Sequence, residues 1–139
     1  MNFSENQSIY LQITGFVQEQ ILLNKWKEEE KIPSVRDLAA ELQVNPNTVM
    51  RAYDFLQQQA VINNRRGVGN FVSTGAIKKI LEIRKQEFVD SEIPALFKTM
   101  VLLGIGFNEL EDSYRKFVSV LLIFVGSGYS YIGWLNKDN

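Results

Sequence analysis

The sequence contains no cysteine and no histidine among its 139 residues. Without cysteine, neither a disulfide framework nor a thiolate metal site can form. Without histidine, the chain lacks the commonest general base and the commonest zinc ligand. The sequence also offers no paired nucleophile and base, so we predict that the protein is not an enzyme and uses no metal or cofactor.

An excess of charge of one sign is also missing, because the formal net charge is only −1. Residues 1–73 hold 7 Lys and Arg against 8 Asp and Glu, and residues 74–139 hold 8 against 8. Nucleic-acid-binding domains are usually basic as a whole. Affinity for DNA would therefore need a local cluster of arginines, with the acidic run Glu28–Glu30 kept away from the phosphates, and two copies engaging together.

The first residues have neither the basic nor the apolar segment of a signal peptide. We therefore expect a cytoplasmic location. An amphipathic helix is predicted over residues 8–24, and Trp26 in the following polar loop is expected to pack against it rather than stack on bases.

Two further helix starts can be recognised in the first half of the chain. Ser34 is followed three residues later by Asp37, a variant of the capping box. Asn45 precedes Pro46, which places a favourable N-cap before a proline at the start of a helix. Only residues 43–44 remain between the two helices, so we predict a helix-turn-helix unit.

The second helix of this unit is predicted to have one apolar and one polar face. Its apolar residues recur at helical spacing and are Val49, Ala52, Tyr53 and Leu56. Asn47 and Arg51 face the opposite way, with Thr48 at the N-terminal shoulder. Asn and Arg can pair with the edges of adenine and guanine. An ordinary surface helix would also have a polar outer face, so this pattern alone leaves both interpretations open.

A short β-hairpin is predicted after this helix. One strand begins at Val61 and the other ends at Val72, with Asn and Gly residues suited to a turn between them. Arg65 and Arg66 lie at the expected tip. Two adjacent like charges suit a wing that contacts phosphates or enters a narrow minor groove. The helix-turn-helix and the basic hairpin together predict a winged helix.

Residues 32–72 resemble the DNA-binding domain of the GntR family of bacterial transcription regulators. The resemblance rests on the segments PSVRDLA (33–39), NTVMRAY (47–53) and GVGNFV (67–72), preceded by IYLQI (9–13). Pro46 and Met50 stand where many members of the family carry arginine. We therefore expect fewer direct contacts from the start of the helix and a different operator sequence.

The resemblance, carried over by position, implies a set of DNA-binding residues in the helix-turn-helix and the wing. They are Ser34, Arg36, Asn45, Asn47, Thr48, Arg51, Arg65, Arg66, Gly67 and Gly69.

The second half of the chain predicts further helices. One begins near Ala76, a second is expected to be capped by Ser91 with Pro94 in its first turn and to stop at Gly104, and a third begins near Asn108. Two or three such helices cannot enclose a large core, so we expect a second copy to cover them. The predicted dimerisation residues are Ile77, Leu81, Phe88, Leu96, Phe97, Met100, Leu103, Leu110 and Tyr114.

This short helical region resembles the YtrA branch of the GntR family, in which the corresponding region dimerises and transporter genes are typical targets. The predicted fold class is mainly α with a small β-hairpin (α+β). The predicted domains are a winged helix-turn-helix over 1–74, a helical dimerisation region over 75–125, and an aromatic and Gly-rich tail of unknown role over 126–139. A small-molecule effector, unidentified from the sequence, would fit at the dimer interface or between the winged domain and the helices.

Residues 117–135 approach the length and apolarity of a membrane span. Gly126, Gly128 and Gly133 interrupt the run, so we expect a dimer helix that ends near Gly126 rather than a membrane anchor. A membrane-tethered regulator is retained as an alternative.

The sequence as a whole predicts a sequence-specific, DNA-binding transcription regulator. We expect a homodimeric repressor whose palindromic operator has half-sites roughly 34 Å apart, and the branch resemblance suggests a transporter operon as its target. The other alternative is a winged-helix protein-interaction module that no longer binds DNA, supported by the weak overall charge.

Overall fold

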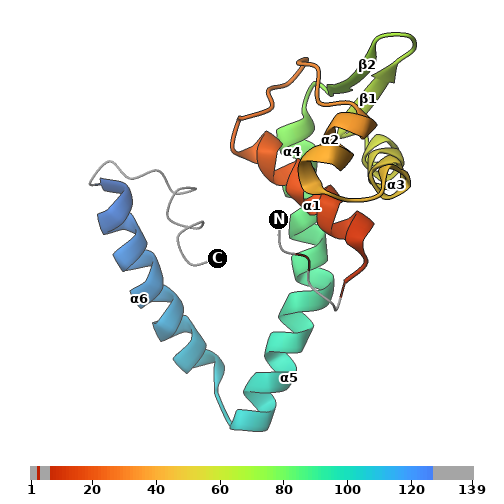
Figure 1. The fold of residues 1–139 in the computed structure, drawn as a ribbon. Helices are drawn as coiled ribbons and strands as arrows, with labels where there is room; N and C mark the ends of the chain where they lie inside the picture. Colours follow the sequence, from red (N-terminus) through yellow and green to blue (C-terminus); the bar gives the residue numbers. More distant parts are fainter. Residues whose placement is uncertain (1–2, 4–6, 127–139) are drawn as a thin grey trace. The chain divides into compact units, whose positions relative to one another are not determined.

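The computed structural model describes residue 3 and residues 7–126 (Figure 1). Its backbone clusters into two compact units, Met1–Gln86 and Glu87–Asn139. The structure is mainly helical with one two-stranded antiparallel hairpin, which confirms the predicted fold class. The first unit contains α1 (Ile9–Leu22), α2 (Val35–Leu42), α3 (Pro46–Gln58), β1 (Ile62–Arg65), β2 (Gly69–Val72) and α4 (Ala76–Glu87). After α4 come the π-helical turn η1 (Phe88–Glu92), α5 (Ile93–Leu103) and α6 (Phe107–Gly126).

Both predicted helix starts of the helix-turn-helix are present. The Ser34 hydroxyl oxygen accepts a hydrogen bond from the Asp37 backbone N–H at 3.2 Å, and the same hydroxyl donates to the Asp37 carboxylate at 2.7 Å. The Asn45 side-chain oxygen accepts from the Asn47 backbone N–H at 2.8 Å. These local bonds satisfy N–H groups that have no partner within the helices, so α2 and α3 begin where the sequence indicates.

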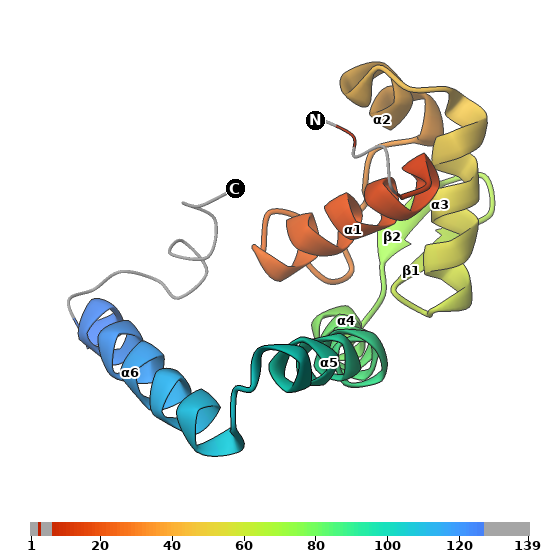
Figure 2. The ribbon, with the colours of Figure 1, turned by 90° about the horizontal axis from the view of Figure 1, so that it is seen from below.

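The core of the first unit lies between α1, α2, α3 and the base of the hairpin. Figure 2 shows α1 lying beside α3, and the apolar stripe predicted for α3 is fully enclosed. Tyr53 is only 1% exposed, and its hydroxyl donates a 2.7 Å hydrogen bond to the backbone carbonyl of Pro33. This bond ties the middle of α3 to the segment that enters α2.

The hairpin extends away from the three helices (Figure 1). Ile62 pairs with Val72 at its base, and Arg65 pairs with Gly69 next to its turn. The segment before α2 adds a further extended stretch, because Lys31 forms a bridge with Phe71. The segment around Lys31 therefore pairs with the outer edge of β2.

The first unit extends beyond residue 74, where the sequence placed a domain boundary. Ala76 and Ile80 of α4 are completely buried in the core of the winged helix, and Ile77 packs partly against that core. Arg84 further along α4 donates to the Gln18 side chain of α1 at 3.3 Å. The helix α4 is therefore an integral part of the first unit.

The cap predicted at Ser91 is wrong, because the backbone is helical without a break from Ala76 to Leu103. In a regular α-helix the ring of Pro94 would clash with the carbonyl of Asp90. The π-helical turn η1 lies just before Pro94 and provides the local irregularity that a proline requires. The predicted stop at Gly104 is confirmed, with φ +68.

The second unit leaves most of its apolar side chains exposed. Val101 and Leu102 of α5 are 83% and 84% exposed. Among the predicted dimerisation residues, Leu81 of α4 and Phe88, Leu96, Phe97, Leu103 and Tyr114 are exposed, while Leu110 is half-buried. Met100 differs, being only 7% exposed in the single chain.

No helix among the described residues is both long and apolar enough to cross a membrane. The helix α6 ends at Gly126, as expected from the glycines of the run 117–135. Residues 127–139, with most of the predicted tail, lie outside the described residues.

Candidate nucleic-acid interface

The first turns of α3 place the predicted base-reading residues on the surface. Asn47 and Arg51 are exposed and Thr48 is half-buried, whereas Val49 and Ala52, which alternate with them, are completely buried. The Asn45 side chain is occupied in capping the helix. The helix therefore presents its polar residues from a fixed backbone, the arrangement that base recognition requires.

Arg51 is held by an aromatic ring of α1. Its guanidinium carbon lies 3.9 Å from the centre of the Tyr10 ring. Next to this pair is an open hollow of about 330 Å³ between the start of α1 and the start of α3, lined by Ser8, Ile9, Tyr10, Asn45, Asn47, Thr48 and Arg51. Four predicted DNA-binding residues thus surround one surface depression.

The two wing arginines, both expected at the tip of the hairpin, lie in different parts of it. Arg65 is the last residue of β1, and its carbonyl accepts the Val68 N–H at 2.9 Å to close a tight turn. Arg66 and Gly67 form that turn and are exposed. Gly67 has φ +74, a conformation that favours glycine. Arg66 therefore lies at the point where a wing would meet DNA.

The Arg65 guanidinium contacts both an aromatic ring and a carboxylate. Its guanidinium carbon lies 3.9 Å from the centre of the Phe71 ring, and one of its nitrogens lies 3.1 Å from a carboxylate oxygen of Glu29. The acidic run Glu28–Glu30, which we expect to lie away from the DNA phosphates, therefore contacts one of the two wing arginines through Glu29. The contact could not be anticipated, because these two residues are 36 positions apart and no local motif links them.

Glu29 also binds the segment that follows the wing. Its other carboxylate oxygen accepts a short hydrogen bond from the Thr74 hydroxyl. This bond has the largest effect on Glu29 and lowers its pKa below the ordinary value of 4.5. Burial acts in the opposite direction, and the positive charge of Arg65 lowers the pKa further. Glu29 is therefore held as a carboxylate at neutral pH.

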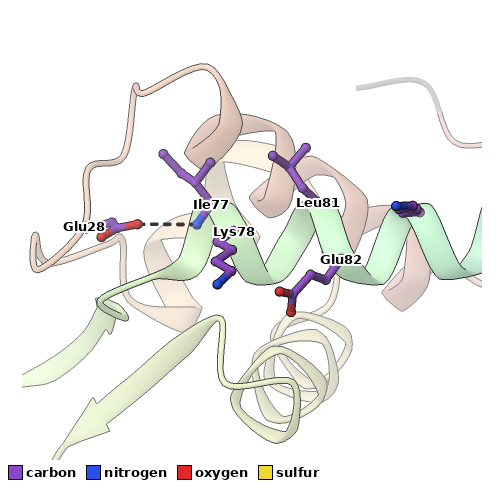
Figure 3. Close-up of a pocket in the computed structure, with 6 residues that line it drawn as sticks. Glu28, Ile77, Lys78, Leu81 and Glu82 are labelled. Carbon is purple, nitrogen blue, oxygen red and sulfur yellow. Dashed lines mark hydrogen bonds between the residues drawn. The ribbon is translucent and has the colours of Figure 1, made fainter.

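The neighbouring Glu28 caps α4, a role the sequence did not reveal. Its carboxylate accepts from the backbone N–H of Gly75 at 2.9 Å and of Ile77 at 3.4 Å, the second of which Figure 3 shows as a dashed line. A negative charge is favourable at a helix N-terminus. The acidic run Glu28–Glu30 thus contacts both the wing, through Glu29, and the start of α4, through Glu28.

A second depression, of about 520 Å³, lies where this loop meets α4 (Figure 3). Its lining residues are Glu28, Ile77, Lys78, Leu81, Glu82 and Lys85. The described residues hold no group of acidic side chains arranged to bind a metal ion.

Comparison with known proteins gives consistent results. The family model of bacterial regulatory proteins of the gntR family matches residues 9–72. The HTH-type transcriptional repressor YtrA of Bacillus subtilis (strain 168) is 32% identical over 108 residues, covering 78% of this chain and 82% of YtrA. The HTH-type transcriptional regulator YhcF of the same organism, itself uncharacterised, is 29% identical over 115 residues, covering 83% and 93%.

A solved structure agrees with the sequence relatives. A GntR-family protein from Bacteroides thetaiotaomicron has a TM-score of 0.72 and 44% identity, covering 81% of this chain and 97% of that one. These relatives are described as transcriptional regulators rather than enzymes, in agreement with the prediction from the missing catalytic residues. The chain belongs to the GntR family of bacterial transcription regulators, with a winged helix-turn-helix as its DNA-binding domain.

Proposed function

We propose that two copies of this regulator bind a palindromic operator, each placing α3 in the major groove and its wing on the adjacent backbone or minor groove. The observation that carries this proposal is the exposure of Asn47 and Arg51 on a helix whose opposite face is completely buried. In this arrangement Asn47, Thr48 and Arg51 read bases, and Arg36 and Arg66 bind phosphates or the minor groove. Ser34 and Asn45 contribute to DNA binding indirectly, by capping the starts of α2 and α3. Gly67 and Gly69 contribute by allowing the backbone conformation of the wing.

The exposed apolar residues of the second unit support a homodimer. Large side chains such as Phe97, Val101 and Leu102 are each at least half exposed in a single chain. Apolar surface of this extent is characteristic of an interface between proteins. A two-fold dimer would match a palindrome with half-sites roughly 34 Å apart, and the predicted dimerisation residues are candidates for its interface.

We further propose that the protein represses transcription. The support is that YtrA, which is similar over most of both chains, is described as a transcriptional repressor. A repressor of this kind acts in the cytoplasm, where its operator lies, and the resemblance to the YtrA branch makes a transporter operon the first target to test. An effector, if one is used, would act by changing the distance between the two wings.

The test is a fluorescence-anisotropy titration of the purified protein against the promoter region of its own operon and against scrambled DNA of equal length. We expect tight binding to the promoter alone, with two chains per site, and affinity that falls steeply with salt. Equal, weak binding to both DNAs would contradict the proposal and favour a protein-interaction module.

The dimer is tested separately by sedimentation equilibrium of Leu102→Glu. Leu102 is 84% exposed in one chain, so the charge is harmless to a monomer and unfavourable in an apolar interface. Asn108→Glu, an exposed polar position of α6, is the matched control with the same added charge. A Leu102→Glu protein that associates as strongly as the control would place the interface elsewhere.

A further inference from the structure

Arg51 does not extend freely into solvent from the surface of α3. The centre of the Tyr10 ring lies 3.9 Å from its guanidinium carbon, and no ion pair fixes Arg51 among the described residues. A guanidinium over an aromatic face is attracted by the negative potential of the ring. The position of the Arg51 charge is therefore set by α1, which contributes none of the residues expected to read bases.

The Tyr10 ring is itself held in place. It meets the Phe55 ring edge-on, with the centres 6.1 Å apart and the planes at 88°. Phe55 lies one helical turn after Arg51 on α3, and Tyr10 packs partly against the core of the winged helix. Figure 2 shows the N-terminal end of α1 beside α3. The Tyr10 ring is thus held beside α3 by Phe55 and by the core.

A guanidinium that lies over an aromatic ring can keep its hydrogen-bonding edge free. Its five N–H groups lie in its own plane, so stacking covers a face and leaves the donors directed outward. Arg51 lines the 330 Å³ hollow together with Asn47 and Thr48. The arrangement presents Arg51 in one orientation next to two further recognition residues, and it reduces the number of rotamers that DNA binding must remove.

We infer that Tyr10 is a positioning residue for operator recognition, which determines specificity by fixing Arg51 in the orientation that reads a base. The inference rests on the proposed function, because it assigns the source of discrimination within the same DNA-binding surface. Tyr10 itself need not touch DNA. Its effect passes through Arg51, so the two residues must be energetically coupled.

The experiment compares Tyr10→Leu, Tyr10→Phe, Arg51→Ala and the double variant Tyr10→Leu/Arg51→Ala, each titrated against the operator and scrambled DNA. Phe16→Leu is the matched control, since Phe16 lies on the same helix and meets Trp26 edge-on at 6.2 Å, and in the part of the chain that the structure describes no arginine lies over its ring. Thermal unfolding of each variant shows that it is folded. We expect Tyr10→Leu to lower the ratio of operator to scrambled affinity by about two- to fivefold at each half-site, and Tyr10→Phe to retain it.

The double variant tests whether Tyr10 acts through Arg51. Tyr10→Leu should have no further effect when Arg51 is already alanine. An equal loss in Phe16→Leu, or a loss that persists in the Arg51→Ala background, would overturn the role of Tyr10. A wild-type protein that does not distinguish the two DNAs would overturn the proposed function instead, whereas discrimination that survives Tyr10→Leu overturns the inference alone.

Discussion

The Glu29 carboxylate lies 3.1 Å from the Arg65 guanidinium, which connects the acidic loop before α2 to the last residue of β1. Phe71 on β2 supports the same guanidinium from its face. Arg65 is therefore fixed and partly neutralised, while Arg66 in the adjacent turn is exposed and forms no ion pair with any of the described residues. Of these two neighbouring arginines, only Arg66 therefore has a charge that is available to DNA.

The first prediction follows from this difference. Arg66→Ala should weaken binding to operator and scrambled DNA by similar factors, and lower the salt dependence of binding by about one unit of slope per wing, because a phosphate contact is lost. Arg65→Ala should change the salt dependence less, since Glu29 already compensates its charge. Anisotropy titrations at several salt concentrations measure both slopes. Equal slopes for the two variants would mean that Arg65 leaves Glu29 when DNA binds.

The second prediction concerns Glu29 itself. Glu29→Gln removes a negative charge beside the wing but keeps an acceptor for the Thr74 hydroxyl, so binding to scrambled DNA should tighten at low salt and converge with the wild type at high salt. Glu30→Gln is the control, because it removes the same charge from a side chain that, among the described residues, accepts a hydrogen bond from the Lys27 backbone N–H at 3.4 Å and forms no ion pair. Equal tightening by both variants would show an effect of net charge rather than of the Glu29–Arg65 contact.

The same carboxylate predicts a pH dependence. Its pKa is lowered in the folded protein, mainly by the Thr74 hydrogen bond and also by Arg65, with burial acting against them. A lowered folded pKa means that the stabilisation is present above the unfolded value of about 4.5 and is lost as pH falls through the folded pKa. The wild type should therefore lose its advantage in thermal stability over Glu29→Gln below about pH 4.5. A constant difference across this range would contradict the assignment.

Much of the first unit could be predicted because its signals are local. Ser34 and Asn45 each bond to a backbone N–H two or three residues away, so their capping could be recognised from short segments. Local signals failed at Ser91, where the need to accommodate Pro94 favours a π-helical turn over a new helix start. A cap is a weak preference of about 1 kcal/mol, which an adjacent constraint can override.

The contacts that organise the candidate site could not be predicted, because they join distant residues through packing. Tyr10 lies 41 positions before Arg51, and Glu28 caps a helix 49 positions further on. The sequence identified the arginines as charges but not the rings and carboxylates that fix them. Side chains of ordinary type in loops and on helix flanks give no periodic signal, and only the folded backbone brings them together.

The fourth prediction concerns the wing backbone. Gly69 has φ +133, a conformation that residues with a side chain rarely adopt, so Gly69→Ala should cost about 1–3 kcal/mol of stability. The added Cβ would also lie 2.9 Å from Cε of Lys31, a contact that the flexible end of the lysine can relieve by moving. Gly67→Asn is the comparison, because Gly67 has open space around it and Asn tolerates its left-handed conformation at a cost of about 1 kcal/mol or less. Urea unfolding measures both. A Gly69→Ala protein as stable as wild type would show that Lys31 and the turn readjust freely.

The last prediction concerns the bond that joins α3 to the start of α2. Tyr53→Phe removes the hydroxyl that donates to the Pro33 carbonyl at 2.7 Å and leaves that acceptor unpaired, so urea unfolding near neutral pH should show a loss of about 1–2 kcal/mol. Burial raises the pKa of Tyr53 above its ordinary value of 10.0, and the charges of Asp37 and Glu41 raise it further.

A raised folded pKa means that this stabilisation is fully present below pH 10 and declines as pH rises above it, because the unfolded tyrosine ionises while the folded one stays protonated. The stability difference between wild type and Tyr53→Phe should therefore shrink between about pH 9 and about pH 11. An unchanged difference would mean that Tyr53 ionises equally in both states. Because Pro33 leads directly into the α2 cap, the variant should also weaken operator binding if the angle between α2 and α3 depends on this bond.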